Sequence, residues 1–144
     1  MASGDVRTAV KSAVEAAAAP WDVFDLSDFV TLEDALPTRA TQAVLIQYVA
    51  SDEQMANIAG AGNQGWRQNT TAVLHLITRA GTDSAPAIAK GDAIREALRG
   101  QRLTNKITIE SCEPFTDFGG AVGLYGGLWK GYAANMFIVR RDCG

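Results

Sequence analysis

The feature that most constrains the fold is the order in which helix-like and strand-like patterns of apolar residues follow one another. A helical pattern opens the chain, and two strand-like runs joined by a glycine-rich stretch come next. A second helical pattern and two further strand-like runs follow, joined by a loop rich in glycine and aromatic residues. Because a chain of 144 residues is long enough to bury a single core, we predict one α/β (α+β) domain over residues 1–144.

The first predicted helix, near residues 5–19, has one apolar stripe. Residues three and four apart share a helix face, and the small and β-branched residues of this segment recur at that spacing. They are Val6, Ala9, Val10, Ala13, Val14 and Ala17. Ser3 or Asp5 can cap the start, and Pro20 ends the helical pattern. We expect the stripe to pack in the core.

The second predicted helix, near residues 84–99, has clear signals at both ends. The side chains that can cap its start are those of Thr82, Asp83 and Ser84. Pro86 suits the first turn, and Gly100 suits the position after the last turn. The expected buried side consists of Ile88, Ala89, Ile94, Ala97 and Leu98. Gly91 lies on the same broad face and would allow a close approach to the sheet.

Four strands are predicted from apolar alternation and β-branched residues. They lie near residues 43–50, 70–78, 105–111 and 132–141. The first, AVLIQYVA, is nearly continuous in apolar character, which is typical of a central strand. In the third, Ile107 and Ile109 are expected to point inward. Residues 21–41 contain five acidic residues, and we expect an extended connection there with a short strand or a turn.

The glycine-rich stretch between the first two strands contains GAGNQG at residues 60–65, which matches the dinucleotide-binding pattern G-x-G-x-x-G. That pattern requires a helix after it, because the helix N-terminus binds the pyrophosphate. Here residues 66–74 have the character of a strand. We therefore interpret the glycines as the tip of a long β-hairpin and not as a nucleotide site.

This hairpin arm, residues 52–69, carries large apolar side chains that need cover. A neighbouring subunit is one source of cover, and the arm's own sheet is the other. Under the first alternative, the inter-subunit contact residues are Met55, Ile58, Gly60, Gly62, Trp66 and Arg67. Burial at an interface also accounts for the aromatic residues of the loop before the last strand more simply than stacking on nucleic acid does. The loop residues chosen on this ground are Leu124, Tyr125 and Trp129.

Residues that carry chemistry are scarce. The chain has one histidine, His75, and two cysteines, Cys112 and Cys143. No Ser/His/Asp set has a recognisable nucleophile elbow, and no His, Cys and acid lie at metal-ligand spacing. We expect no enzyme activity, no cofactor and no metal, with His75 in a structural role and both cysteines as free thiols. The net charge of −3 gives no electrostatic drive toward nucleic acid, and no apolar run has membrane-spanning length.

The order and residue composition of several segments carry a resemblance to a known family. In chain order they are AVLIQYVA, NIAGAGNQGWRQNT, TTAVLHLITRAG, TDSAPAIAKGDAIREALRG, QRLTNKITIE and NMFIVRR. From Gln42 to its C-terminus the chain resembles the tail terminator family of long-tailed bacteriophages and related gene transfer agents. The resemblance covers roughly two-thirds of the chain and lies in segment order rather than in a signature motif. Residues 20–41 and 114–131 match nothing in it.

The resemblance implies a mostly antiparallel or mixed four-stranded sheet with flanking helices, in the order α-β-β-α-β-β, and a long β-hairpin arm. It implies a structural virion protein that forms a homo-oligomeric ring, a hexamer, at the head-proximal end of the tail. The ring would end polymerisation of the tail tube protein and join the head connector or neck protein. DNA would only pass through its lumen, and assembly would take place in the host bacterial cytoplasm. Leu124, Tyr125 and Trp129 then become candidates for the contact with tube or neck.

Two other interpretations of the sequence stay open. One is a different phage neck or tail subunit, such as a head-closure or tube protein, which assembly behaviour would distinguish because tube subunits polymerise. The other is a small cytoplasmic ligand-binding or enzymatic domain that uses the glycine- and aromatic-rich loop as a pocket. A ligand retained through purification would identify that second class.

Overall fold

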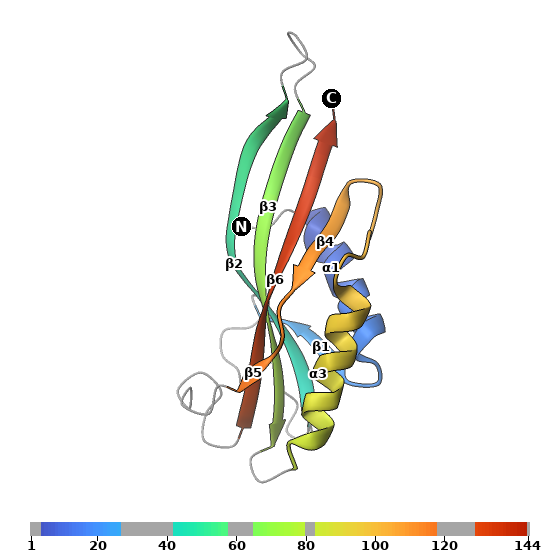
Figure 1. Ribbon diagram of the computed structural model, residues 1–144, viewed down its shortest axis with the longest axis vertical. Helices are drawn as coiled ribbons and strands as arrows, with labels where there is room; N and C mark the ends of the chain where they lie inside the picture. The colour runs from blue at the N-terminus through green and yellow to red at the C-terminus, as the bar shows by residue number, and fades with distance from the viewer. Residues whose placement is uncertain (1–3, 27–41, 58–64, 80–82, 118–128, 144) are drawn as a thin grey trace.

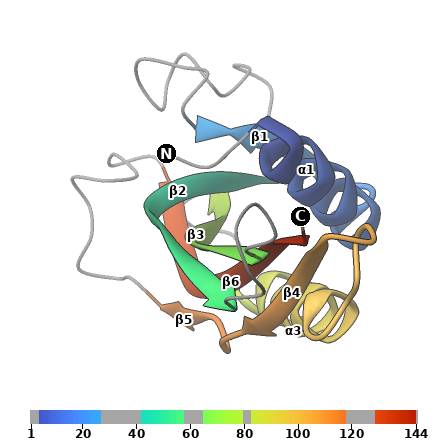
Figure 2. The same cartoon turned by 90° about the horizontal axis from the view of Figure 1, so that it is seen from above.

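Antiparallel pairing of three long strands determines the architecture (Figure 1). The structure, a computed structural model, describes residues 4–26, 42–57, 65–79, 83–117 and 129–143. Viewed along the strands, α1 lies beside β1 and α3 beside β4, both on the same side of a twisted sheet (Figure 2). The helices and strands are α1 (Gly4–Ala18), β1 (Asp22–Asp25), β2 (Gln42–Asn57), β3 (Gly65–Arg79), α3 (Ala85–Leu98), β4 (Ile107–Cys112), β5 (Thr116–Asp117) and β6 (Trp129–Cys143).

The strand order across the sheet is β1-β2-β3-β6-β4, and the short β5 pairs with β6. β1 runs parallel to β2, and the other pairs are antiparallel. The predicted α+β class is confirmed, and a strand is present at each of the four predicted places. The predicted count and order are wrong in detail, because β1 and β5 add to the sheet. Both are short and are held by pairing with a longer neighbour, which no apolar pattern of their own reveals.

β2, β3 and β6 are longer than predicted. They have 16, 15 and 15 residues, and their additional residues are mostly polar. Pairing with neighbouring strands, rather than apolar alternation, holds these residues in the strand conformation. Gly65 opens β3, so the glycine pattern leads into a strand, as predicted, and not into the helix that a dinucleotide site needs.

The main core lies between the sheet and the two helices. Val6, Val10 and Val14 of α1 are fully buried, which confirms the predicted stripe. Three partly buried alanines pack beside them, namely Ala9, Ala13 and Ala17. The strand residues of the same cluster include Val44, Ile46, Ala72, Leu74, Leu76, Met136 and Ile138. Because burial of one large apolar side chain is worth roughly 1.5–3 kcal/mol, this layer holds the helices on the sheet.

A second, smaller cluster lies on the opposite face of the sheet at one end. It consists of Ala43, Leu45 and Ile77, and the partly buried residues packed against it are Phe24, Leu26 and Trp129. Val44 and Ile46 alternate with these residues along β2 and belong to the main core. This end of β2 is therefore buried on both faces, which explains its nearly continuous apolar sequence.

Helix α3 buries only part of the predicted face: Ile94, Leu98 and the neighbouring Gly91 are buried as predicted, whereas Ile88, Ala89 and Ala97 are not. Its buried residues are Ala87, Gly91, Ile94 and Leu98. Ile88 is 53% exposed, and Ala89 and Ala97 are exposed as well. The reason is the ring of Phe115, which packs on Gly91 so closely that a β-carbon there would lie 3.1 Å from ring atom Cδ2. The inward face therefore centres on Gly91 with Ile94 and Leu98, and Ile88 is left outside it.

The ends of α3 follow their sequence signals. Oδ1 of Asp83 accepts a hydrogen bond from the Ala85 amide at 3.1 Å, while Ser84 occupies the cap position without a side-chain bond. Pro86 lies in the first turn. Gly100 follows the helix with φ of +74°, a left-handed conformation that favours glycine after a helix end.

Replacement of Gly91 by leucine should destabilise the protein by roughly 1–3 kcal/mol, because the new side chain must displace the packed Phe115 ring. The matched control is Ala93→Leu on the exposed side of the same helix, which should change the free energy of unfolding by about 0.5 kcal/mol or less. Chemical denaturation followed by circular dichroism measures both. Equal effects of the two substitutions would show that the contact with Phe115 does not constrain the helix.

Candidate interaction surface

The three long strands continue past the helices and past β4 and form an arm at one end of the molecule (Figure 1). We define the arm as residues 52–57 of β2, 65–69 of β3 and 139–143 of β6. Both neighbours pair with β3 up to Gly65, its first residue. The predicted antiparallel pairing of β2 and β3 is present, and β6 adds a third strand to the arm. A strand over residues 132–141 was predicted, but its pairing beside β3 in the arm was not, because the sequence pattern does not show which strands are neighbours.

On the sheet face opposite the helices, a polar bridge between side chains holds the arm in place. Arg67 donates a hydrogen bond from Nε to Oδ1 of Asn69 at 2.8 Å and another from Nη2 to Oε1 of Glu110 at 2.9 Å. Because β6 lies between β3 and β4, the Arg67–Glu110 pair crosses β6, at the level of the buried Val139. Nη2 of Arg141 lies 4.0 Å from the same carboxylate oxygen. Exposed ion pairs contribute only about 0.2–1 kcal/mol, so the bridge orients the arm more than it stabilises the fold.

A second ion pair binds the arm to α1. Nε of Arg140 donates to Oδ2 of Asp5 at 2.7 Å. Asp5 lies in the first turn of the helix, where a carboxylate also interacts favourably with the helix dipole. The base of the arm is thus held from both faces of the sheet.

Large apolar side chains are exposed on and near the arm. Of the four such residues in the described part of the chain, Trp66, Val49 and Phe137 lie on β3, β2 and β6. Trp66, on the arm itself, is 45% exposed. Val49 and Phe137, which are 51% and 36% exposed, lie within one cross-strand row of each other, with β3 between them. Exposed large apolar side chains are candidates for interaction surfaces. By strand alternation, Trp66 and Phe137 lie on opposite faces of the sheet.

The structure separates the predicted contact residues into several groups. Trp66 is exposed, as a contact residue must be, and Met55 is its cross-strand neighbour on β2. Arg67 is bonded within its own chain through the bridge. The predicted contact residues that lie outside the described part are Ile58, Gly60, Gly62, Leu124 and Tyr125. Phe137 and Val49 were not predicted.

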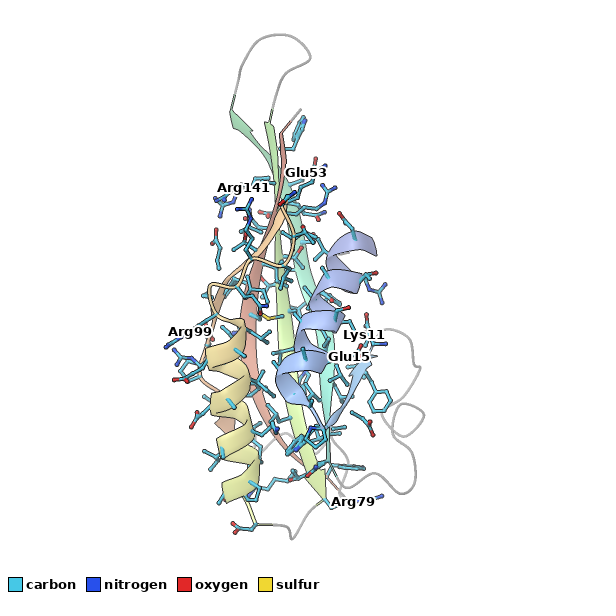
Figure 3. The ribbon with its side chains drawn as sticks, turned by 90° about the vertical axis from the view of Figure 1, so that its right-hand side faces the viewer. Lys11, Glu15, Glu53, Arg79, Arg99 and Arg141 are labelled. Atoms are coloured by element: carbon cyan, nitrogen blue, oxygen red, sulfur yellow. The ribbon has the colours of Figure 1, made fainter. Side chains whose placement is uncertain are left out.

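Trp129 lies at the opposite end of the sheet from Trp66. It pairs with Arg79, the last residue of β3, and Cζ of Arg79 lies 4.5 Å from the centroid of its ring, a cation–π contact. Figure 3 shows Arg79 at the far end from Glu53 and Arg141. Because β3 has 15 residues and a strand rises about 3.3 Å per residue, roughly 45 Å separate the two ends. Trp66 and Trp129, one described residue from each predicted contact group, therefore lie on distinct surfaces.

His75 lies in a structural environment. It is 4% exposed, and its Nε2 lies 2.9 Å from Oε1 of Gln47 on β2. Burial lowers the pKa of His75 to about 4, so the imidazole is neutral at neutral pH and donates to the amide oxygen. Burial foremost raises the pKa of the free Cys112 thiol to about 11, which keeps it protonated. Within the described residues, no three or more His, Cys, Asp or Glu side chains could hold a metal ion together.

A shallow groove of about 300 Å³ lies beside α1. The residues that line it are Gly4, Arg7, Thr8, Lys11 and Asp25. Arg7 donates to Oδ2 of Asp25 from Nε at 3.0 Å and from Nη2 at 2.7 Å. Nearby, burial and then the Asp25 charge raise the pKa of Tyr48, so its hydroxyl stays neutral. The groove therefore holds an internal ion pair between Arg7 and Asp25.

Comparison with known proteins adds no family assignment. A scan against models of protein families found no match, and a search of curated proteins found none either. In the part of the chain that the structure describes, neither helix is long and apolar enough to cross a membrane. The features that bear on function are therefore the arm, the two ends of the sheet and the resemblance in segment order.

Stability should fall as the pH drops from about 6.5 to about 4, in part because of His75. Its pKa is about 4 in the folded chain against an ordinary value of 6.5, so in this window the unfolded chain binds a proton that the folded chain excludes. This contribution is fully present above the ordinary pKa and is lost toward the folded one, on the order of 3 kcal/mol in all.

In His75→Gln this part of the pH dependence should disappear, while stability near neutral pH and function are retained. Urea unfolding of both proteins at several pH values between about 4 and about 7 measures the difference directly. Parallel curves for the two proteins would contradict a buried neutral histidine.

Proposed function

We propose that the protein is the subunit of a closed ring, a hexamer, that caps the head-proximal end of a phage tail tube. The ring ends tube polymerisation and provides the joint to the head connector. The observation that carries this proposal is the arm, in which three strands extend beyond the helices and present an exposed Trp66. The resemblance of the segment order to the tail terminator family supports the same conclusion.

Trp66 gives the arm a reason to contact another subunit. Among the described residues nothing covers its exposed part, and burial of one large apolar side chain is worth roughly 1.5–3 kcal/mol. Tryptophan is also among the residues that dominate binding energy at interface centres. Because the Arg67–Glu110 bridge already orients the arm, little conformational freedom is lost when a neighbour binds. The contact repeats at every interface of a ring.

The two ends of the sheet suit a subunit that joins two structures. The arm is at one end, and Trp129 with its Arg79 partner is at the other. In a capping ring, each subunit needs a lateral contact and also separate surfaces toward the tube and toward the connector. Under this proposal the arm provides the lateral contact, and the end that carries Trp129 faces tube or connector. DNA only passes through the lumen, and the ring is part of the virion.

The first test shortens the arm. Residues 57–64 are replaced by Asn-Gly, a two-residue turn that suits a hairpin, because β2 ends at Asn57 and β3 begins at Gly65. The variant should remain a folded monomer but fail to assemble on tail tubes. In a phage that lacks its own terminator, it should yield tails of uncontrolled length that do not join heads, as seen by electron microscopy. Normal capping by this variant would show that the arm tip is not the contact.

A second variant tests the exposed tryptophan alone. Trp66→Ser should abolish ring assembly, with a change in the free energy of unfolding of about 1 kcal/mol or less, since the side chain is half exposed. The matched control is Ile88→Ser, which removes an equally exposed apolar side chain from α3 and should leave assembly intact. An intact protein that polymerises along the tube would instead indicate a tube subunit, and one that never associates with tubes would end the proposal.

A further inference from the structure

The two long edges of the sheet differ in how much of their backbone is covered. On the outer side of β4, the segment that follows α3 is bonded to the strand, with the Ile109 amide donating to the Gln101 carbonyl at 2.8 Å. On the outer side of β2, β1 pairs only with Ala43–Ile46. Among the described residues, nothing pairs with the outer edge of β2 over residues 47–57. A free strand edge of this length is a template for association unless the protein protects it.

The edges also differ in charge at the level of the arm. β2 carries Asp52 and Glu53, both exposed, and it has no lysine or arginine. The opposite edge carries the exposed side chains of Arg102, Lys106 and Arg141. Among the described side chains at this level, one edge therefore carries two acids (the acidic edge), and the other carries three basic residues and one acid, Glu110 (the basic edge).

The basic edge keeps donors for a partner carboxylate. Arg102 uses Nε and Nη2 on the carbonyl oxygens of Thr104 and Asn105, at 3.4 and 3.2 Å, which leaves three of its five N–H groups. Arg141 is 57% exposed and lies 4.0 Å from Glu110, whose carboxylate is already bonded by Arg67. Glu110, the acid described on this edge, is thus already engaged by Arg67.

The register places the acidic and basic groups at the same height along the strands. The row that begins at Glu53 runs through three pairs: Glu53–Gln68, Gln68–Arg140 and Arg140–Ile107. Its last residue adjoins Lys106 along the chain. In Figure 1, β2 and β4 form the two sides of the sheet, and in Figure 3 Glu53 and Arg141 both lie at the arm end. A second copy set beside the first therefore needs no shift along the strands to bring opposite charges together.

We propose that copies of this chain associate head to tail, with the acidic β2 edge of one copy against the basic edge of the next. Asp52 and Glu53 of one subunit then face Arg102, Lys106 and Arg141 of its neighbour. The inference rests on the ring of the proposed function and specifies its lateral contact. A heterologous contact of this kind generates a ring when the rotation closes.

The same charges oppose the simplest alternative, a two-fold dimer through two β2 edges. That arrangement would place Asp52 and Glu53 of one copy near the same residues of the other, and like charges across strands are destabilising. Charge repulsion thus protects the free edge of β2 from pairing with the β2 edge of another copy. The charge of this edge is complementary to that of the opposite edge of the sheet.

The test reverses each edge separately. The acid-reversed variant is Asp52→Lys with Glu53→Lys, and the base-reversed variant is Arg102→Glu with Lys106→Glu. Each alone should raise the apparent dissociation constant of the ring about tenfold or more at low ionic strength, because like charges then meet at every contact. Sedimentation velocity and native mass spectrometry measure the assembly state, and circular dichroism confirms that each variant is folded.

A mixture of the two variants tests directly whether the acidic edge of one copy meets the basic edge of another. Each variant alone brings like charges together at every contact. An equimolar mixture should instead assemble into rings in which the two variants alternate, because natural contacts and contacts between two reversed edges then both pair opposite charges. The chain with all four reversals should assemble again by itself. The matched control is Asp92→Lys with Glu96→Lys on the exposed face of α3, which makes the same change in net charge as the acid-reversed variant and should leave the ring intact.

The outcomes separate this inference from the proposed function. Rings that persist in both reversed variants, or a mixture that does not assemble, would overturn the edge contact while tail capping could still hold. A natural protein that stays monomeric at high concentration and low ionic strength would also overturn it. Rings that form through these edges but never cap tail tubes would retain the contact and refute the tail function.

Discussion

Backbone pairing of β3 with its two neighbours is the interaction on which the rest of the structure depends. β3 pairs with β6 at every residue from Gly65 to Arg79, and with β2 over almost the same span apart from two register shifts. This ladder provides hydrogen-bond partners for the N–H and C=O groups of the polar residues, whose side chains are not buried in the core. It therefore carries the sheet past the helices, creates the arm and sets the distance between the two ends. The helices cover only the part of the sheet where apolar residues alternate inward.

Apolar periodicity predicted most of the core, whereas it did not predict the third strand of the arm or the exposure of Ile88. Val6, Val10 and Val14 follow from helical spacing alone, because burial selects that spacing. The polar ends of the long strands have no such pattern, and they become strands only through partners that are distant in sequence. The face of α3 depends in the same way on Phe115, which the sequence gives no reason to place against Gly91. Local rules failed where a contact between distant segments decided the outcome.

The residues of the candidate surface were likewise predictable only in part from the sequence. Trp66 was found because a large apolar residue beside a glycine-rich tip lacks local cover. Phe137 was missed, although the inward positions of its two neighbours on β6 place it on the opposite face. Val49 lies at a register shift, which no pattern in the sequence marks. Arg67 was expected to face a partner, but the topology that puts β6 between β3 and β4 brings Glu110 within reach of it.

A ring requires that each copy meet the next without a step along the ring axis, since a constant step produces an open helix instead. One cross-strand row, from Glu53 to the residues around Ile107, carries opposite charges at its two ends. In the proposed edge-to-edge contact, these charges meet at the same height in both copies, so no step along the ring axis arises. The twist of the sheet, seen along the strands in Figure 2, turns the two edges relative to each other. Successive copies added at the edges then follow a curved path. The antiparallel ladder that creates the arm would thus also determine the height and the angle at which subunits meet.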